Sequence, residues 1–148
     1  MRARDIMTTH PSVVIPTEAI MRAAQMMRDR HVGMLPVVDD LRHRRLIGLL
    51  TDRDVTVRCV ARGHAQSCTV ADHMTGHPLA WVSPDADVRE VAARMRERRV
   101  RRMPVIDADH RVVGLVTLFD LSTRLQGAER ELAGDVEQWM GPQPIGAR

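Results

Sequence analysis

Lysine and tyrosine are absent from this sequence, and it holds only one phenylalanine, two tryptophans and two cysteines. Without lysine and tyrosine, few groups titrate between neutral and strongly basic pH, so a net charge of only +3 gives a pI near 10.0. The high pI by itself therefore does not indicate a nucleic-acid-binding protein. Aromatic residues make up 2% of the chain, which leaves few rings for bases to stack on and disfavours single-strand or RNA recognition.

Long apolar runs are missing as well. No stretch reaches the roughly 18 unbroken apolar residues of a membrane span, and residues 1–5 do not begin the apolar core of a signal peptide. Cys59 and Cys68 are too few for a disulfide framework and fit a reducing compartment. We therefore expect a cytoplasmic protein that does not enter a membrane.

Common catalytic motifs are absent too. The sequence has no Gly-x-Ser-x-Gly elbow, no His-Glu-x-x-His helix and, without lysine, no P-loop. We expect a protein that is not an enzyme and that requires no cofactor. A hydrophobic fraction of 44% with 28% charged residues indicates a globular chain, and 148 residues fit one domain or two small ones that share a core.

What the sequence does contain is an internal repeat. The matching pairs are 5–7 with 72–74, 16–39 with 84–107, and 46–51 with 112–117. Their offsets of 67, 68 and 66 residues differ only by small changes in loop length. Two copies of one unit, each too small to bury its own apolar face, predict a single fused core. We divide the chain into a first domain, a second domain and a C-terminal tail, at residues 1–66, 67–125 and 126–148.

The same elements are predicted in each copy. Apolar residues at helical spacing after Pro16 and Pro84 predict amphipathic helices of about four turns. A second helix should begin at Thr51 or Thr117, and Gly63 can end the first of these. Two hairpins and two extended leading segments complete the pattern, at 35–50, 103–116, 12–15 and 79–83. The fold class is thus α/β (α+β), with helix, strand, strand, helix in each copy and an extra strand before them.

The C-terminal tail lies outside the repeat. Residues 129–139 predict a short helix, which the Gly-Pro-Gln-Pro segment at 141–144 ends. We expect this tail to lock onto a partner subunit.

Together these motifs resemble the CBS-domain family (cystathionine-β-synthase type). The resemblance rests on Asp-Ile-Met, an extended segment closed by Pro, an amphipathic helix, an apolar-Pro-Val-apolar-Asp strand, and Gly-apolar-x-Thr-x-x-Asp at a strand-to-helix junction. It covers about residues 3–125, and residues 50–55 are similar to small bacterial stand-alone pairs.

The resemblance implies a Bateman module, in which two CBS domains pack by pseudo-two-fold symmetry. Many members hold AMP, ATP or a related adenosine ligand in clefts between the repeats, and such modules commonly form homodimers. We therefore expect a regulatory sensor that signals to an unknown protein partner by conformational or oligomeric change.

The two strand-to-helix junctions are the central ligand-binding candidates. A helix that starts there presents backbone N–H groups and a positive dipole end to a phosphate. The carboxylate three residues after the threonine can accept two hydrogen bonds from a ribose diol. Thr-x-x-Asp is also close to a capping box, which would serve folding alone. The candidates are Thr51, Arg53 and Asp54 in the first copy and Thr117 and Asp120 in the second.

Arg101 and Arg102 are further candidates, because guanidinium groups suit bidentate phosphate recognition. They stand just before Pro104, whereas Gly33 and Met34 occupy the matching positions of the first copy. This difference puts equal occupancy of two clefts in doubt. The two arginines also continue an ordinary solvated face formed by Arg94, Arg96, Arg98 and Arg99.

Two alternative functions stay open. The arginine run favours a basic surface for nucleic acid or an acidic partner, since Arg94, Arg98 and Arg101 would share one side of a helix. Interleaved glutamates and the lack of a groove-reading motif make nucleic acid the less favoured partner. The other alternative is a zinc-binding CBS protein. Its weak metal candidates are His64, Cys68, His73 and His77, whose spacing matches no compact zinc finger.

Overall fold

The computed structural model describes residues 1–64, 67–124 and 138, and the chain divides into two compact units. Unit 1 comprises Met1–Thr9, Ala80–Val105 and the chain from Val113 onward, and unit 2 comprises His10–Leu79 and Ile106–Val112. Both mix helix and sheet, which confirms the predicted fold class. The tail helix predicted at 129–139 lies outside the described residues, and the domain boundaries at 66 and 125 stay predictions.

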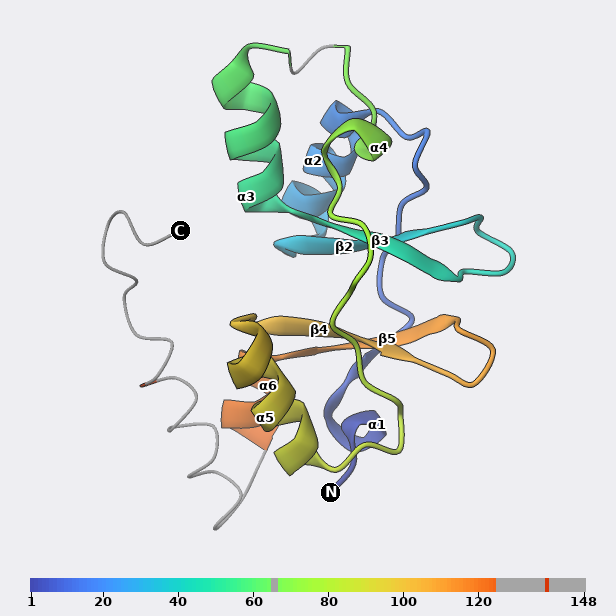
Figure 1. Cartoon of the computed structure of the whole chain (residues 1–148), viewed down its shortest axis with the longest axis vertical. Coiled ribbons are helices and arrows are strands. Elements are labelled where there is room, and N and C mark those ends of the chain that lie inside the picture. The colour runs from blue at the N-terminus through green and yellow to red at the C-terminus, as the bar shows by residue number, and fades with distance from the viewer. Residues whose placement is uncertain (65–66, 125–137, 139–148) are drawn as a thin grey trace. The chain divides into compact units, whose positions relative to one another are not determined.

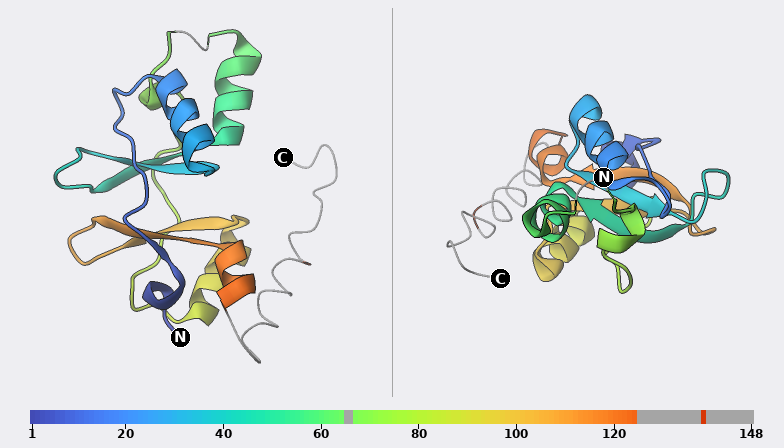
Figure 2. Two further views of the ribbon diagram at one scale, coloured as in Figure 1. Left: turned by 180° about the vertical axis from the view of Figure 1, so that it is seen from behind. Right: turned by 90° about the horizontal axis from the view of Figure 1, so that it is seen from above.

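Unit 2 is a β-hairpin covered on one face by helices (Figures 1 and 2). Its elements are α2 (Ile20–Arg30), β2 (Met34–Val38), β3 (Leu46–Thr51), α3 (Asp52–Asp54), a π-helical turn (Val55–Cys59), a 3-10 turn (Val60–Arg62) and α4 (Val70–His73). The strands pair antiparallel, with Pro36 opposite Leu49, and confirm the predicted hairpin. The helical stretch that begins after Thr51 ends at Gly63, whose positive φ of 75° closes it as predicted.

Unit 1 repeats this plan (Figure 1). Its elements are α1 (Ala3–Ile6), β1 (Thr8–Thr9), α5 (Val88–Arg98), β4 (Arg102–Ile106), β5 (Val112–Thr117) and α6 (Leu118–Arg124). The strands form a sheet in the order β1-β5-β4. Each predicted leading segment is extended, but it makes a single parallel bridge, Val14 to Val37 in unit 2 and Val82 to Val105 in unit 1. A short strand pairing therefore replaces the full leading strand that the sequence suggested.

The amphipathic helices α2 and α5 are shorter than predicted. Each has 11 residues, or about three turns rather than four. Both end in the same way, because His31 and Arg99 adopt a left-handed conformation at φ 53° and 55° and close Schellman hydrogen bonds. In the described part of the chain, no helix has both the length and the apolar character that a bilayer crossing needs.

The predicted apolar faces of these helices form the cores. Ile20, Ala23 and Met27 of α2 pack into one core in unit 2, and the corresponding face of α5 packs into the core of unit 1. A smaller apolar cluster of unit 2 includes Val13, Val38 and Leu46. All five residues of β2 are buried, in keeping with its unbroken apolar run.

Unit 1 is formed mainly by the second copy of the repeat, and unit 2 mainly by the first. In each unit a short helix completes the core, and this helix comes from the segment that precedes the other copy in the sequence. α1 leads into the first copy but belongs to unit 1, where Met7 lies over Gly114. α4 leads into the second copy but belongs to unit 2, where Met74 lies over Gly48. In each unit, the methionine of the repeated Asp-x-Met motif thus packs on the repeated glycine of the second hairpin strand.

This contact requires glycine. A methyl group on Gly114 would lie 2.9 Å from Cγ of Met7, which real contacts essentially never show. We therefore expect Gly114→Ala to lower the free energy of unfolding by about 1–3 kcal/mol, as overpacking does. Urea denaturation measures this change.

Gly76→Ala is the control, because nothing lies within 4 Å of a Cβ built on Gly76. Its unfolding free energy should stay within about 0.5 kcal/mol of the parent value. Equal stabilities of the two variants would contradict the proposed role of the Met–Gly contact.

Candidate functional site

The junction between β5 and α6 is closed by a capping box. The Asp120 carboxylate accepts hydrogen bonds from the Thr117 backbone N–H at 2.8 Å and from its hydroxyl at 2.7 Å. The Asp120 N–H donates in return to the Thr117 hydroxyl at 3.1 Å. All of these carboxylate contacts use Oδ2, and Oδ1 lies 3.7 Å from Nε of Arg124. One oxygen of the buried Asp120 thus serves the fold, and the other makes only a long ion pair.

The first copy builds the same box between β3 and α3. The Thr51 N–H donates to Asp54 Oδ2 at 3.0 Å, and the Asp54 N–H donates to the Thr51 hydroxyl at 3.1 Å. Oδ1 of Asp54 lies 3.5 Å from a guanidinium nitrogen of Arg58. Capping, one of the two interpretations of Thr-x-x-Asp, is therefore present in both copies, and ligand contact stays a prediction.

The expectation that backbone N–H groups at these helix starts would be open to a phosphate is wrong for most of them. The Leu118 N–H donates to the Arg101 carbonyl at 2.8 Å, and the matching Asp52 N–H donates to Gly33 at 3.0 Å. The Arg53 N–H donates to the Asp52 side chain. Because the chain satisfies these donors itself, a phosphate near either junction needs side-chain cations.

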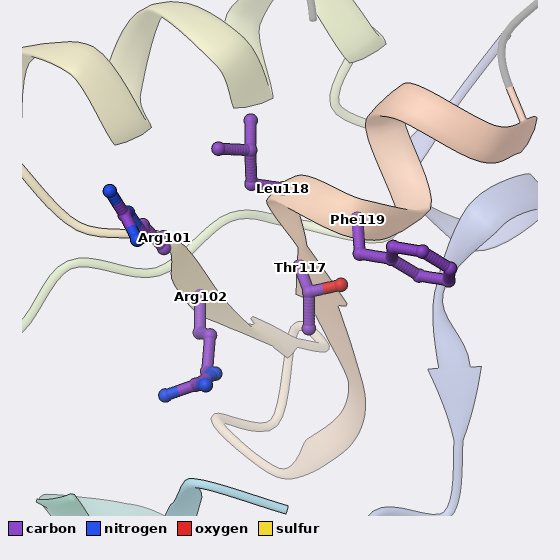
Figure 3. A pocket seen from close by; sticks show the side chains of 5 residues that line it. All are labelled: Arg101, Arg102, Thr117, Leu118 and Phe119. Carbon is purple, nitrogen blue, oxygen red and sulfur yellow. The ribbon is translucent and has the colours of Figure 1, made fainter. Parts of the chain in front are cut away.

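Such cations line a cavity in unit 1. It measures about 450 Å³ and is lined by Arg101, Arg102, Thr117, Leu118 and Phe119. Figure 3 shows the two guanidinium groups at the start of β4 pointing apart, with Thr117 between Arg102 and the Phe119 ring. The size lies within the range of about 300–1,000 Å³ found for small-molecule sites. Three of the predicted residues therefore come together, and sequence reasoning missed the two apolar ones, which directly follow Thr117.

The half-buried Arg102 and the exposed Phe119 are the two lining residues of this cavity that have groups available to a ligand. The Arg102 side chain makes no hydrogen bond or ion pair to any residue within 1–64 or 67–124. Phe119 is 71% exposed although it is the one phenylalanine of the sequence. A free guanidinium and an uncovered ring give the cavity a group for a phosphate and a surface for a base.

The first copy offers a different environment. Met34, at the position of Arg102, is buried, and Gly33 at the position of Arg101 has no side chain. Arg53 is exposed on α3, beside the capping box of Thr51 and Asp54. The asymmetry expected from the sequence thus persists in the positions of the side chains.

The prediction that Arg94, Arg98 and Arg101 share one side of a helix is wrong for Arg101. α5 ends at Arg98 and the chain turns at Arg99, so Arg101 leaves the helix side that it was expected to share with Arg94. Arg94 pairs with the Glu90 carboxylate at 2.9 Å and donates to the Trp81 carbonyl. This pairing reduces the positive charge that a nucleic acid would meet along the helix.

A group of metal-ligating side chains lies in unit 2. Cys59, His64, Cys68 and His73 each offer one ligand atom, and these atoms all lie within 4.8 Å of one another. Three of the weak metal candidates are thus brought together, Cys59 joins them, and His77 is exposed outside the group. Burial, followed by a hydrogen bond with Cys68, raises the pKa of the Cys59 thiol. The spacing Cys-x4-His-x3-Cys-x4-His was the sequence signal for this group.

Comparison with known proteins identifies the repeat. The CBS domain family model matches residues 3–60 and again residues 70–127. Hypoxic response protein 1 of Mycobacterium tuberculosis is 37% identical over 123 residues, which cover 83% of this chain and 84% of that protein.

Solved structures share the fold. Hypoxic Response Protein I with two coordinated zinc ions has a TM-score of 0.75 at 37% identity, covering 85% of this chain and 100% of that one. CBSX2 in complex with AMP has a TM-score of 0.69 at 27% identity, covering 80% and 91%. The CBS domain pair of protein MJ0100, with 5′-methylthioadenosine and S-adenosyl-L-methionine, has a TM-score of 0.71 at 29% identity, covering 82% and 97%.

The capping boxes give a direct stability prediction. Thr117→Ala removes the hydroxyl that accepts from the Asp120 N–H and should lower the free energy of unfolding by about 0.5–2 kcal/mol. Thr117→Ser is the control, because it keeps the hydroxyl, and it should lose much less. Chemical denaturation compares the two, and an equal loss in both would show that the methyl group rather than the cap matters.

Proposed function

Because this chain belongs to the CBS-domain family, we propose that it is a regulatory module that binds an adenosine-containing nucleotide in the cavity of unit 1. The observation that carries the proposal is the pairing of an unengaged Arg102 guanidinium with an exposed Phe119 ring in one cavity. CBSX2 binds AMP and the MJ0100 pair binds S-adenosyl-L-methionine, both of which contain adenosine. These neighbours support the ligand class and leave the particular nucleotide to experiment.

Each part of the nucleotide has a counterpart among the lining residues. Arg102, with Arg101 beside it, supplies positive charge for the phosphates, since a guanidinium binds phosphate oxygens in bidentate fashion. The base covers the Phe119 ring and removes its apolar surface from water. The ribose lies between them near Thr117, where Oδ1 of Asp120 is the remaining carboxylate acceptor.

The matching junction of the first copy is the weaker part of the proposal. Thr51, Arg53 and Asp54 would contact the polar groups of a ribose there. Because Met34 stands at the position of Arg102, we propose that this copy takes an uncharged group or stays empty when the unit 1 cavity is occupied.

The proposed mechanism is ligand linkage without a catalytic step. A ligand that binds one conformation stabilises it by its binding free energy, and a protein partner then reads that conformation. The residues that line the cavity include no histidine, cysteine or lysine for covalent or acid–base chemistry. The proposal places the protein in the cytoplasm, where nucleotides are present and its two free thiols stay reduced.

Arg102→Met tests the phosphate contact. Methionine is the residue of the first copy at this position, so the strand should tolerate it. Loss of a charged hydrogen bond should weaken AMP binding by roughly 10-fold or more, while adenosine binding should change little. Isothermal titration calorimetry with AMP and adenosine measures both affinities.

Arg96→Met is the matched control, because Arg96 is an exposed arginine of α5 that does not line the cavity. It should bind AMP like the parent chain. Equal AMP affinity in the Arg102 and Arg96 variants would exclude this cavity as the phosphate site. Failure of AMP, ATP and S-adenosylmethionine to bind the parent chain would reject the proposed function.

A salt series separates this function from the basic-surface alternative. Binding to a phosphate backbone weakens steeply with salt because many counterions are released, whereas a single nucleotide in a cavity involves few phosphate contacts. AMP affinity that varies little with salt, together with no binding of a duplex or single strand at physiological salt, supports the nucleotide sensor. The reverse pattern supports the nucleic-acid interface.

We also propose that the chain forms a homodimer through helices of unit 2. Met21 of α2 is 48% exposed, and Val57 and Val60 after α3 are 49% and 56% exposed. Large apolar side chains on neighbouring helices are a usual feature of an interface between copies. Sedimentation equilibrium should give a dimer for the parent chain and more monomer for Val60→Glu, and a monomeric parent would contradict the proposal.

A further inference from the structure

Two cysteines and two histidines converge in unit 2 from four separate places along residues 59–73. Cys59 ends the π-helical turn, His64 follows the glycine that closes the helix, Cys68 precedes α4, and His73 is the last residue of α4. Nδ1 of His64 lies 3.3 Å from Sγ of Cys68, and the rings of His64 and His73 stack at 5.5 Å between centroids. Side chains on different elements thus meet at one point.

His73 supplies the independent sign that this point is made for a ligand. It is 6% exposed, and its Nε2 is buried without a hydrogen-bond partner among the described residues. Buried polar nitrogens in folded proteins almost always have a partner, because an unsatisfied one costs free energy. A metal ion would accept the lone pair of Nε2 and remove that cost.

The repeat shows what this position holds when no ligand is needed. Ile6 matches His73 in the other copy and is 1% exposed inside the apolar core of unit 1. The same short helix therefore folds with an isoleucine in this slot. Histidine at the matching place of α4 is a departure that packing alone does not require.

The chemistry of the group matches one kind of ion. Two thiolates and two imidazoles form the Cys2His2 set that zinc prefers, and the two thiolate charges neutralise the dication, so the ion can be buried. Tetrahedral zinc with its usual bond lengths holds ligand atoms about 3.3–3.8 Å apart, so the present spacing of up to 4.8 Å needs only a small contraction. Four protein ligands leave no open position, which is typical of a structural rather than a catalytic site.

We propose that Cys59, His64, Cys68 and His73 bind one zinc ion. This ion would link the end of the helical stretch after β3 to α4. The zinc site is also connected, through Arg58, to the capping box of Thr51 and Asp54. Arg58 donates to the His73 carbonyl at 3.0 Å and lies 3.5 Å from the Asp54 carboxylate. The zinc therefore fixes the position of α4 and, through Arg58, supports the start of α3.

A second group of possible ligands, Asp39, Asp40 and His43, does not support the same conclusion. Its carboxylates already accept backbone N–H groups of the β2–β3 turn, such as those of Arg42 and His43, and Asp40 also contacts the His43 ring at 2.7 Å. These bonds are the ordinary construction of an Asx-type turn.

Metal analysis of the purified full chain is the first test. Protein prepared with zinc under reducing conditions and then desalted should hold about one zinc per chain. Replacement by Co²⁺ should give the visible d–d bands and thiolate charge-transfer absorption of a tetrahedral site. Removal of zinc by a chelator should lower the thermal midpoint by roughly 5 °C or more, and zinc should restore it.

His73→Ile is the decisive variant, because the isoleucine of the other copy occupies the same slot and the variant should fold. Its zinc affinity should fall by at least about 100-fold, because loss of a ligand costs more than the roughly 10–100-fold that follows loss of a hydrogen-bond partner of a ligand, and chelation should then leave its thermal midpoint unchanged. His77→Ala is the matched control, since His77 lies outside the group. It should keep full zinc content and the chelator response.

Three outcomes would overturn the site. The parent chain would hold no zinc and give no cobalt spectrum, or His73→Ile would keep the zinc content of the parent. In the third, protein supplied with zinc and then exposed to dioxygen would hold no metal, and dioxygen would oxidise its two thiols to a Cys59–Cys68 disulfide, seen as the mass loss of two hydrogens. None of these outcomes bears on AMP binding in unit 1. The zinc proposal and the nucleotide proposal are therefore tested independently of each other.

Discussion

The burial of each hairpin's apolar face is the constraint on which the rest of this structure depends. Two helices of one copy cover most of that face, and a short helix that precedes the other copy completes it. The close contact of a methionine with a strand glycine fixes the short helix in place, through Met7 and Gly114 in unit 1 and Met74 and Gly48 in unit 2. Neither copy contains in one continuous stretch everything that its core needs.

The polar groups at the strand-to-helix junctions serve this fold first. Thr117 and Asp120 satisfy each other, and the carbonyl of Arg101 takes up the N–H of Leu118. Because these backbone N–H groups already donate within the chain, an anion at the junction must be bound by side chains. This requirement explains why Arg102, whose side chain makes no hydrogen bond or ion pair with the described residues, is the strongest candidate for a phosphate contact.

Positions at which the two copies differ indicate function more clearly than positions at which they agree. Shared residues such as the capping threonines have a structural explanation in both units. Arg102 stands where the other copy buries Met34, and His73 stands where it buries Ile6. In each case the matching apolar residue shows that the fold alone does not require the polar one. The internal repeat thus supplies its own comparison for each candidate site.

Local pattern and repetition in the sequence determined the order of elements, the apolar faces of α2 and α5, the hairpins and the Thr-x-x-Asp junctions, because these follow from near-neighbour periodicity. Helix length was overestimated, since the left-handed turn at His31 and Arg99 carries no glycine to announce it. Only tertiary structure decided that α1 and α4 complete the cores of the units, that the helix-start donors are internally satisfied, and that Cys59 rather than His77 joins the metal-ligating group. These outcomes depend on distances between separate helices, strands and turns, and such distances are set by packing rather than by spacing in the sequence.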